Sequence, residues 1–117
     1  PYKLFLTITN SQLCSLGFGN SQNIILLDNP SFEEIFGSYK YIDYLIYPSS
    51  SESYGLPLIE AGLNNIDIIA SNLEYVYDVC KPYLVFNPSS IKDISNKIKF
   101  SLKSNNRLPK QNNLSLK

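Results

Sequence analysis

The stretch that decides the fold is residues 44–61, which read YLIYPSSSESYGLPLIEA. Its first four residues, Tyr44–Tyr47, form an apolar run with the length of a buried strand. A loop of small polar residues follows, and Gly55 stands just before an apolar segment that carries Pro57 near its start. Because proline costs a helix little in its first turn, the stretch predicts a strand, a loop and a helix in succession.

Short apolar runs without clean alternation recur on both sides of this stretch, as expected for strands buried on both faces of a parallel sheet. Helical patterns separate them, with Ser31 and the pair Ser89-Ser90 as capping residues. The order predicts an α/β fold, a Rossmann-like open parallel sheet with helices on both faces. The expected strands are Lys3–Thr9, Asn23–Leu27, Tyr44–Tyr47, Asp67–Ala70 and Tyr83–Phe86, and the expected helices are Phe32–Phe36, Leu56–Leu63 and Ile91–Leu102.

The composition narrows the classes of function. The 117 residues suit one domain, and ten basic and ten acidic side chains cancel, so bulk charge attracts neither nucleic acid nor an anionic membrane. No apolar run approaches the roughly 20 residues needed to cross a bilayer, and no signal peptide is recognisable. We therefore expect a cytoplasmic protein, with peripheral attachment to the inner face of the membrane as the alternative.

The chain contains no histidine, which excludes histidine acid–base chemistry and the commonest zinc sites within it. Its two cysteines, Cys14 and Cys80, form no CxxC pair. Their pattern favours two buried thiols in a cytosolic protein, while a disulfide between them stays open. If the protein is an enzyme, carboxylates and backbone amides must carry the chemistry.

The loop between Tyr47 and Leu56 is the candidate ligand site, because ligands of open parallel sheets bind at the carboxyl ends of the strands. Free N–H groups at the helix start favour an anion, and Gly55 allows its close approach. Glu52 and Glu60 can accept hydrogen bonds from sugar hydroxyls. The residues alone leave an alternative open, because glutamates near a helix start are also common for electrostatic reasons. The common phosphate-loop motifs are absent.

Residues 48–61 resemble the Glu-x7-Glu signature of the retaining glycosyltransferases with a GT-B fold, the glycosyl transferases group 1 type. The likeness continues through Ile68–Asn72, Asp78-Val79 and Phe86–Pro88, and covers roughly residues 23–102. It implies that residues 1–103 form the nucleotide-sugar-binding half of such a fold, truncated at its N-terminal side. Residues 104–117 are polar, and we expect them to be a flexible tail.

The resemblance implies a role for each matching position. Glu60 would bind the ribose hydroxyls of the nucleotide, and Glu52 would act as the catalytic residue beside the donor sugar. Backbone N–H groups around Tyr54, Gly55 and Leu56 would hold sugar hydroxyls and the distal phosphate. No metal or other cofactor is expected, since the nucleotide sugar is itself the donor substrate. The further donor-binding residues implied are Ser51 and Ser53 in the loop, with Asn29 and Pro30 beside the base.

The sequence departs from the family pattern in ways that affect function. In the family, an arginine and a lysine near the start of the domain neutralise the diphosphate. No arginine precedes Arg107 here, and Lys3 falls within a predicted strand, so that pair has no counterpart in this sequence. The acceptor-binding N-terminal domain is missing as well, and we expect the chain alone to be inactive. The family's central strand is also missing, so either Lys3–Thr9 takes its place or two chains associate as a homodimer. Glu74-Tyr75 replaces a common Pro-Gly turn and is predicted to be a loop.

The predicted function is donor binding in a retaining glycosyltransferase, with transfer to a saccharide or lipid-linked acceptor and a role in surface polysaccharide biosynthesis. A non-catalytic GT-B-derived module that binds a nucleotide or a protein partner is the alternative. The tyrosines between Tyr39 and Tyr47 are predicted to pack a helix onto a strand.

Overall fold

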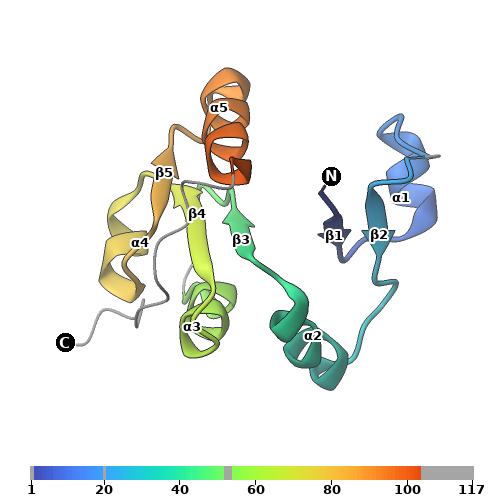
Figure 1. The fold of residues 1–117 in the computed structure, drawn as a ribbon, viewed down its shortest axis with the longest axis horizontal. Coiled ribbons are helices and arrows are strands. Elements are labelled where there is room, and N and C mark those ends of the chain that lie inside the picture. The colour runs from blue at the N-terminus through green and yellow to red at the C-terminus, as the bar shows by residue number, and fades with distance from the viewer. Residues whose placement is uncertain (1, 20, 52–53, 104–117) are drawn as a thin grey trace. The chain divides into compact units, whose positions relative to one another are not determined.

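The computed structural model describes residues 2–19, 21–51 and 54–103. Two predicted site residues, Glu52 and Ser53, and the predicted tail 104–117 lie outside the described residues. The chain divides into two compact units, which we call the N-terminal unit (Pro1–Gly37) and the C-terminal unit (Ser38–Lys117). Figure 1 draws both units.

The N-terminal unit is a parallel pair of strands joined by a helix. Strand β1 (Leu4–Leu6) pairs with β2 (Ile24–Leu26), and α1 (Asn10–Ser15) connects them. Helix α2 (Phe32–Ser38) begins in this unit, and the Ser31 hydroxyl accepts the N–H of Glu34 at 3.1 Å, which confirms the predicted cap. The buried hydrophobic core of the unit's described residues consists of Leu13.

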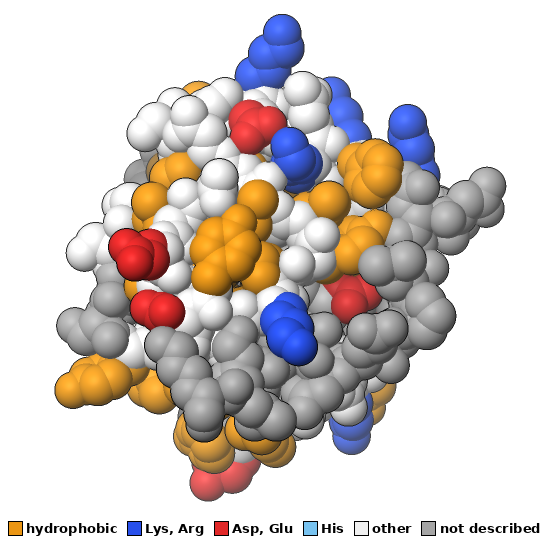
Figure 2. All heavy atoms as spheres, turned by 90° about the vertical axis from the view of Figure 1, so that its left-hand side faces the viewer, with side chains coloured by type: hydrophobic (Ala, Val, Ile, Leu, Met, Phe, Trp, Pro, Cys, Tyr) orange, Lys and Arg blue, Asp and Glu red, His pale blue; other side chains and the backbone are white. Residues whose placement is uncertain are grey.

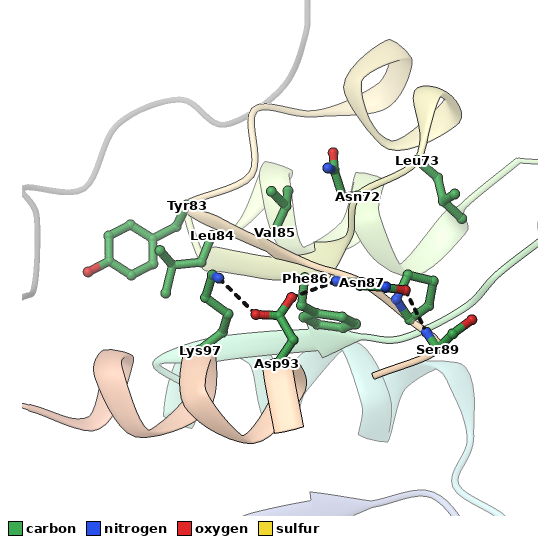
Figure 3. Close-up of a pocket in the computed structure, with 11 residues that line it drawn as sticks. Asn72, Leu73, Tyr83, Leu84, Val85, Phe86, Asn87, Ser89, Asp93 and Lys97 are labelled. Carbon is green, nitrogen blue, oxygen red and sulfur yellow. Dashed lines mark hydrogen bonds and ion pairs between the residues drawn. The ribbon is translucent and has the colours of Figure 1, made fainter. Parts of the chain in front are cut away.

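The C-terminal unit is a three-stranded parallel sheet in the order β3-β4-β5. The central strand is buried along its whole length, α3 packs on β3 and β4, and α5 packs on β5. The ribbon in Figure 3 has α4 and α5 on opposite sides of β5. The elements are the 3-10 helix η1 (Tyr39–Tyr41), β3 (Tyr44–Tyr47), α3 (Leu56–Leu63), β4 (Asp67–Ser71), α4 (Glu74–Val79), β5 (Leu84–Phe86) and α5 (Ile91–Leu102).

The predicted α/β class with parallel strands is confirmed, and every predicted strand is present, although the first two and the last are shorter than expected. Thr9 was expected to end the first strand but caps α1 instead. Its hydroxyl accepts the N–H of Gln12 at 3.1 Å, and the Gln12 side chain accepts the N–H of Thr9 at 2.8 Å. This reciprocal pair satisfies two N–H groups that a helix start leaves open, which is why the helix begins there.

Three further expectations were wrong. Glu74 begins α4 and is not part of a loop, and an acidic residue in a first turn interacts favourably with the helix dipole. Both cysteines are free in the structure, but Cys14 is exposed and only Cys80 is buried, so the prediction of two buried thiols fails for Cys14. Tyr41 is 71% exposed, so it does not pack a helix onto a strand as predicted.

Candidate functional site

The loop after β3 is held in place from the neighbouring crossover. The Ser49 hydroxyl donates to the backbone carbonyl of Ser51 at 3.2 Å, which tightens the loop locally. From α4, the Tyr75 hydroxyl donates to the backbone carbonyl of Ser49 at 2.9 Å. The loop that begins the candidate site is therefore fixed to the segment that follows β4.

Gly55 sets the direction in which α3 starts. Its φ of 60° and ψ of 45° lie in the left-handed region, which a residue with a Cβ adopts only at a cost. A Cβ there would also stand 3.1 Å from Cδ1 of Leu58. The Leu58 N–H donates to the Gly55 carbonyl at 2.9 Å as the first bond of the helix. The N–H groups of Gly55 and Leu56 precede that bond, so they have no acceptor within the helix and suit an anion.

Glu60 is the fifth residue of α3 and is half-buried. Its Oε2 accepts a hydrogen bond from the Tyr39 hydroxyl at 2.8 Å. Its backbone carbonyl accepts the side-chain N–H of Asn64 at 2.8 Å, one turn further along the helix. The carboxylate is thus oriented by a residue from η1, and the backbone at the same position is held by Asn64, the C-cap of α3.

Tyr39 is 5% exposed, and its environment favours the neutral phenol. Burial is the largest cause that raises the pKa of Tyr39 well above its usual range, and the hydrogen bond to Glu60 and the charge of Glu60 raise it further. The phenol therefore stays protonated at neutral pH and remains a hydrogen-bond donor to Glu60. Together the two residues form an acceptor carboxylate supported by a neutral donor.

Most of the predicted site residues lie in the loop after β3 and in the helix α3 that follows it. Glu60 and Gly55 are positioned as described above, Tyr54 and Leu56 are 76% and 60% exposed, and Ser51 is exposed in the loop. Glu52 and Ser53 lie outside the described residues. The remaining two, Asn29 and Pro30, lie in the N-terminal unit between β2 and α2, where Asn29 has a φ of 45°.

An open hollow of about 790 Å³ lies along β5 and α5, and it includes none of the predicted residues. Figure 3 shows Asp93, one of its lining residues, between Asn87 and Lys97. The Asp93 carboxylate accepts the N–H of Asn87 at 2.8 Å and the Lys97 ammonium at 3.1 Å. The Asn87 N–H contributes most to holding the pKa of Asp93 below its usual range, and Lys97 adds to it. These two contacts stabilise the first turns of α5, and Asp93 therefore has a structural role.

The described surface offers no other strong indication of a ligand. On the face in Figure 2, acidic and basic side chains are interspersed among hydrophobic ones, in keeping with the zero net charge. The described residues include no group of three or more potential metal-binding side chains. Among the same residues, no helix is both long enough and apolar enough to span a bilayer.

Two contacts of the site were missed by the sequence analysis. Tyr39 was expected only to pack a helix onto a strand, and Tyr75 was placed in a loop. Each instead uses its hydroxyl in a long-range hydrogen bond, to Glu60 and to the Ser49 carbonyl respectively. The sequence gives only a general indication of such contacts. A buried tyrosine hydroxyl usually has a hydrogen-bond partner, but the sequence does not say which residue it is.

Comparison with known proteins identifies the family. The profile of the family described as Glycosyl transferases group 1 matches residues 10–115, a wider range than the resemblance at 23–102 suggested. Searches of curated proteins and of solved structures gave no significant match. Nearly the whole chain is covered by the family profile, and its parallel strands, loop and α3 have the expected order. The chain therefore belongs to the group 1 glycosyltransferases and carries their C-terminal, GT-B-type domain.

Proposed function

We propose that this chain binds the nucleotide-sugar donor of a retaining glycosyltransferase through the loop after β3 and the helix α3 that follows it. The observation that carries the proposal is the position of Glu60, whose carboxylate is held by Tyr39 in a helix that starts at left-handed Gly55. That arrangement supplies N–H donors for a phosphate and a carboxylate acceptor for hydroxyls within the same helix. Membership of the group 1 family supports the same ligand class.

The proposed roles follow the chemistry of each group. Glu60 accepts hydrogen bonds from the ribose hydroxyls, and the N–H groups around Tyr54, Gly55 and Leu56 receive sugar hydroxyls and the distal phosphate. Ser51 and Ser53 complete the loop beside the donor sugar. Asn29 and Pro30, with Asn29 already in a left-handed conformation, contact the base.

The transfer step depends on stabilising the charge that develops on the departing diphosphate. Preorganised N–H donors at the start of α3 would contribute to that stabilisation without a metal ion. In this proposal Glu52 lies beside the reacting carbon of the donor sugar. A saccharide or a lipid-linked saccharide is the proposed acceptor, in surface polysaccharide biosynthesis, and an acceptor-binding domain is the proposed partner.

The proposal is tested by ligand-observed NMR with UDP, GDP, ADP and CMP, on the wild-type chain and on Glu60→Ala. We expect one nucleotide to bind selectively and to lose most of its affinity in the variant, because a good hydrogen bond to a charged group is worth about 1.5–3 kcal/mol. Asp93→Ala is the control, since it removes a carboxylate at the start of α5 that belongs to the ion pair with Lys97. Equal binding by wild type and Glu60→Ala would contradict the assignment of this residue.

Absence of binding by all four nucleotides would favour the alternative function, a GT-B-derived module that recognises a partner protein. A pull-down with a separately produced acceptor-binding domain would then be the next measurement. Binding of the matching nucleotide sugar, together with hydrolysis or transfer of its sugar to an acceptor, would extend the proposal to catalysis by this chain.

A further inference from the structure

The hydrogen bond between Tyr39 and Glu60 joins two elements that are far apart in the sequence. Tyr39 begins η1, just before β3, whereas Glu60 lies in α3, after the loop. The 2.8 Å bond is made by a tyrosine that is 5% exposed to a glutamate that is half-buried. A partly buried polar pair of this kind is costly unless its members are hydrogen-bonded, so the bond should form in most folded molecules.

The bond restricts the Glu60 carboxylate in particular. Within the described part of the chain, the structure gives the carboxylate one hydrogen bond, and Tyr39 donates it. The contact from Asn64 reaches the backbone carbonyl of Glu60 and does not constrain the side chain. A glutamate side chain has high rotamer freedom, and ordering it only when a ligand arrives weakens binding.

The direction of the bond also matters for recognition. Tyr39 remains the donor, because burial and the adjacent carboxylate both oppose its ionisation. One oxygen of Glu60 is therefore partly occupied, while the other can accept hydrogen bonds only, and hydroxyl groups are the natural donors for it. The two hydroxyls of a vicinal diol, such as a ribose, can both donate to the acceptor positions that Tyr39 leaves open on the carboxylate, whereas a single hydroxyl uses only one of them.

We propose that Tyr39 is a positioning residue that fixes the Glu60 carboxylate for ribose recognition, so that preference for a ribonucleotide over its 2′-deoxy form depends on the Tyr39 hydroxyl. This inference rests on the proposed function, in which Glu60 binds the nucleotide ribose. It assigns to Tyr39 no contact with the ligand. Its effect is transmitted entirely through Glu60.

The test compares dissociation constants for the nucleotide that binds among UDP, GDP, ADP and CMP with those for its 2′-deoxy counterpart. Tyr39→Phe removes one hydroxyl and keeps the buried ring. We expect it to weaken ribonucleotide binding about three- to tenfold, the factor associated with ordering one side chain on binding. We expect the 2′-deoxy nucleotide to change by less than about twofold, because it forms fewer bonds to Glu60.

Tyr44→Phe is the matched control. It also removes a partly buried tyrosine hydroxyl, which donates to the Ser101 carbonyl at 3.0 Å. That bond joins β3 to α5 and does not involve Glu60. We expect this variant to retain the preference for the ribonucleotide. If Tyr39→Phe weakens both nucleotides equally, or behaves like Tyr44→Phe, Tyr39 has only a structural role and the inference is overturned.

Glu60→Ala separates failure of the inference from failure of the proposed function. If Glu60→Ala abolishes the preference and Tyr39→Phe leaves it unchanged, the inference fails and the function stands. If Glu60→Ala also leaves the preference unchanged, or if wild type binds no nucleotide, the proposed function fails and the inference with it. In the double variant Tyr39→Phe/Glu60→Ala, Tyr39→Phe should cause no further loss of ribonucleotide affinity, because the carboxylate that it positions is absent.

A measurement without ligand tests the pair directly. At neutral pH, the ¹³Cζ chemical shift of labelled Tyr39 reports the hydrogen bond of its hydroxyl in wild type and in Glu60→Gln. We expect the shift to move in the variant, because a neutral amide is a weaker acceptor than a carboxylate. An unchanged shift would contradict the contact on which the inference depends.

Discussion

The two units of this chain use the same strand–helix–strand pattern but bury very different amounts of apolar surface. Among the described residues, the N-terminal unit contributes Leu13 to the buried hydrophobic core, and all other members of that core lie in the C-terminal unit. The N-terminal unit leaves Tyr2, Phe18 and Phe32 more than half exposed. The C-terminal unit also leaves some large side chains exposed, Tyr54 and Leu56 among them, but it fully buries Ile68 and Ile69 in β4.

The difference shows what a parallel sheet needs in order to be stable. Parallel strands are normally covered on both faces, and a unit of fewer than about 40 residues seldom buries enough surface to fold alone. The C-terminal unit meets the first requirement through its helices, with β4 between β3 and β5. We therefore expect the free energy of folding to come mainly from this unit, which also contains Glu60.

The largest effect should come from truncating the core of the C-terminal unit. Ile69→Ala removes fully buried methyl groups from the central strand and should lower the free energy of unfolding by about 2–5 kcal/mol. Leu13→Ala should leave the main unfolding transition nearly unchanged. Urea unfolding followed by circular dichroism measures both. Equal destabilisation by the two variants would show that the units fold as one cooperative body.

Each unit carries one cysteine, and their reactivities should differ strongly. Cys14 is exposed, whereas Cys80 is 1% exposed and burial raises its pKa from 9.0 to about 11. That shift alone lowers the thiolate fraction of Cys80 at neutral pH about a hundredfold. Mass-spectrometric timing of alkylation by iodoacetamide should find Cys14 modified at least that much faster. The difference should vanish in concentrated urea, and comparable native rates would contradict the burial of Cys80.

High pH should weaken the C-terminal unit selectively. Cys80 and Tyr39 both have raised pKa values in the folded state, so the native unit holds protons that the unfolded chain releases. Their contribution is complete below pH 9 and falls as the pH rises towards 11, because the unfolded state then binds fewer protons. Urea titrations at pH 8, 9, 10 and 10.5 should show a loss of about 1–2 kcal/mol attributable to Cys80. Cys80→Ala should have a flatter profile, and a rise in stability over this range would contradict the assignment.

The smallest effect concerns an unpaired buried hydroxyl in the C-terminal unit. The Ser71 hydroxyl, at the end of β4, is fully buried and has no hydrogen-bond partner among the described residues. Leaving such a group unpaired costs about 1–3 kcal/mol, so Ser71→Ala should be neutral or stabilise the unit by about 1 kcal/mol. Thermal unfolding at constant protein concentration resolves that difference. A clear destabilisation would mean that the hydroxyl has a partner, such as a buried water.

Much of the fold could be predicted because strong local signals coincide with it. Apolar runs identified the strands, and Ser31 and Ser90 identified two helix starts. Helix α1 was missed although the Thr9–Gln12 capping pair was present in the sequence, because the apolar run before it was extended too far. Helix α4 has a weaker start signal in the sequence, because its N-cap residue, Leu73, has no side chain that can cap the helix.

The candidate site was predictable only as far as its residues are consecutive. The sequence placed Glu60 in an early turn of the helix and Gly55 at its start, and both positions are confirmed. Tyr39 could not be paired with Glu60 in advance, because 21 residues separate them and the chain offers other tyrosines. Which tyrosine reaches the carboxylate depends on how η1, β3 and α3 pack, and spacing along the chain does not encode that.

The bond from Tyr75 to the Ser49 carbonyl gives the protein a spectroscopic probe of its own. The chain has no tryptophan and nine tyrosines, and Tyr75 is one that contacts the loop after β3 directly. A rearrangement of that loop must either carry the Tyr75 ring along or release its hydroxyl. With the other rings unlabelled, a single fluorinated tyrosine at position 75 would record such a rearrangement without any foreign dye.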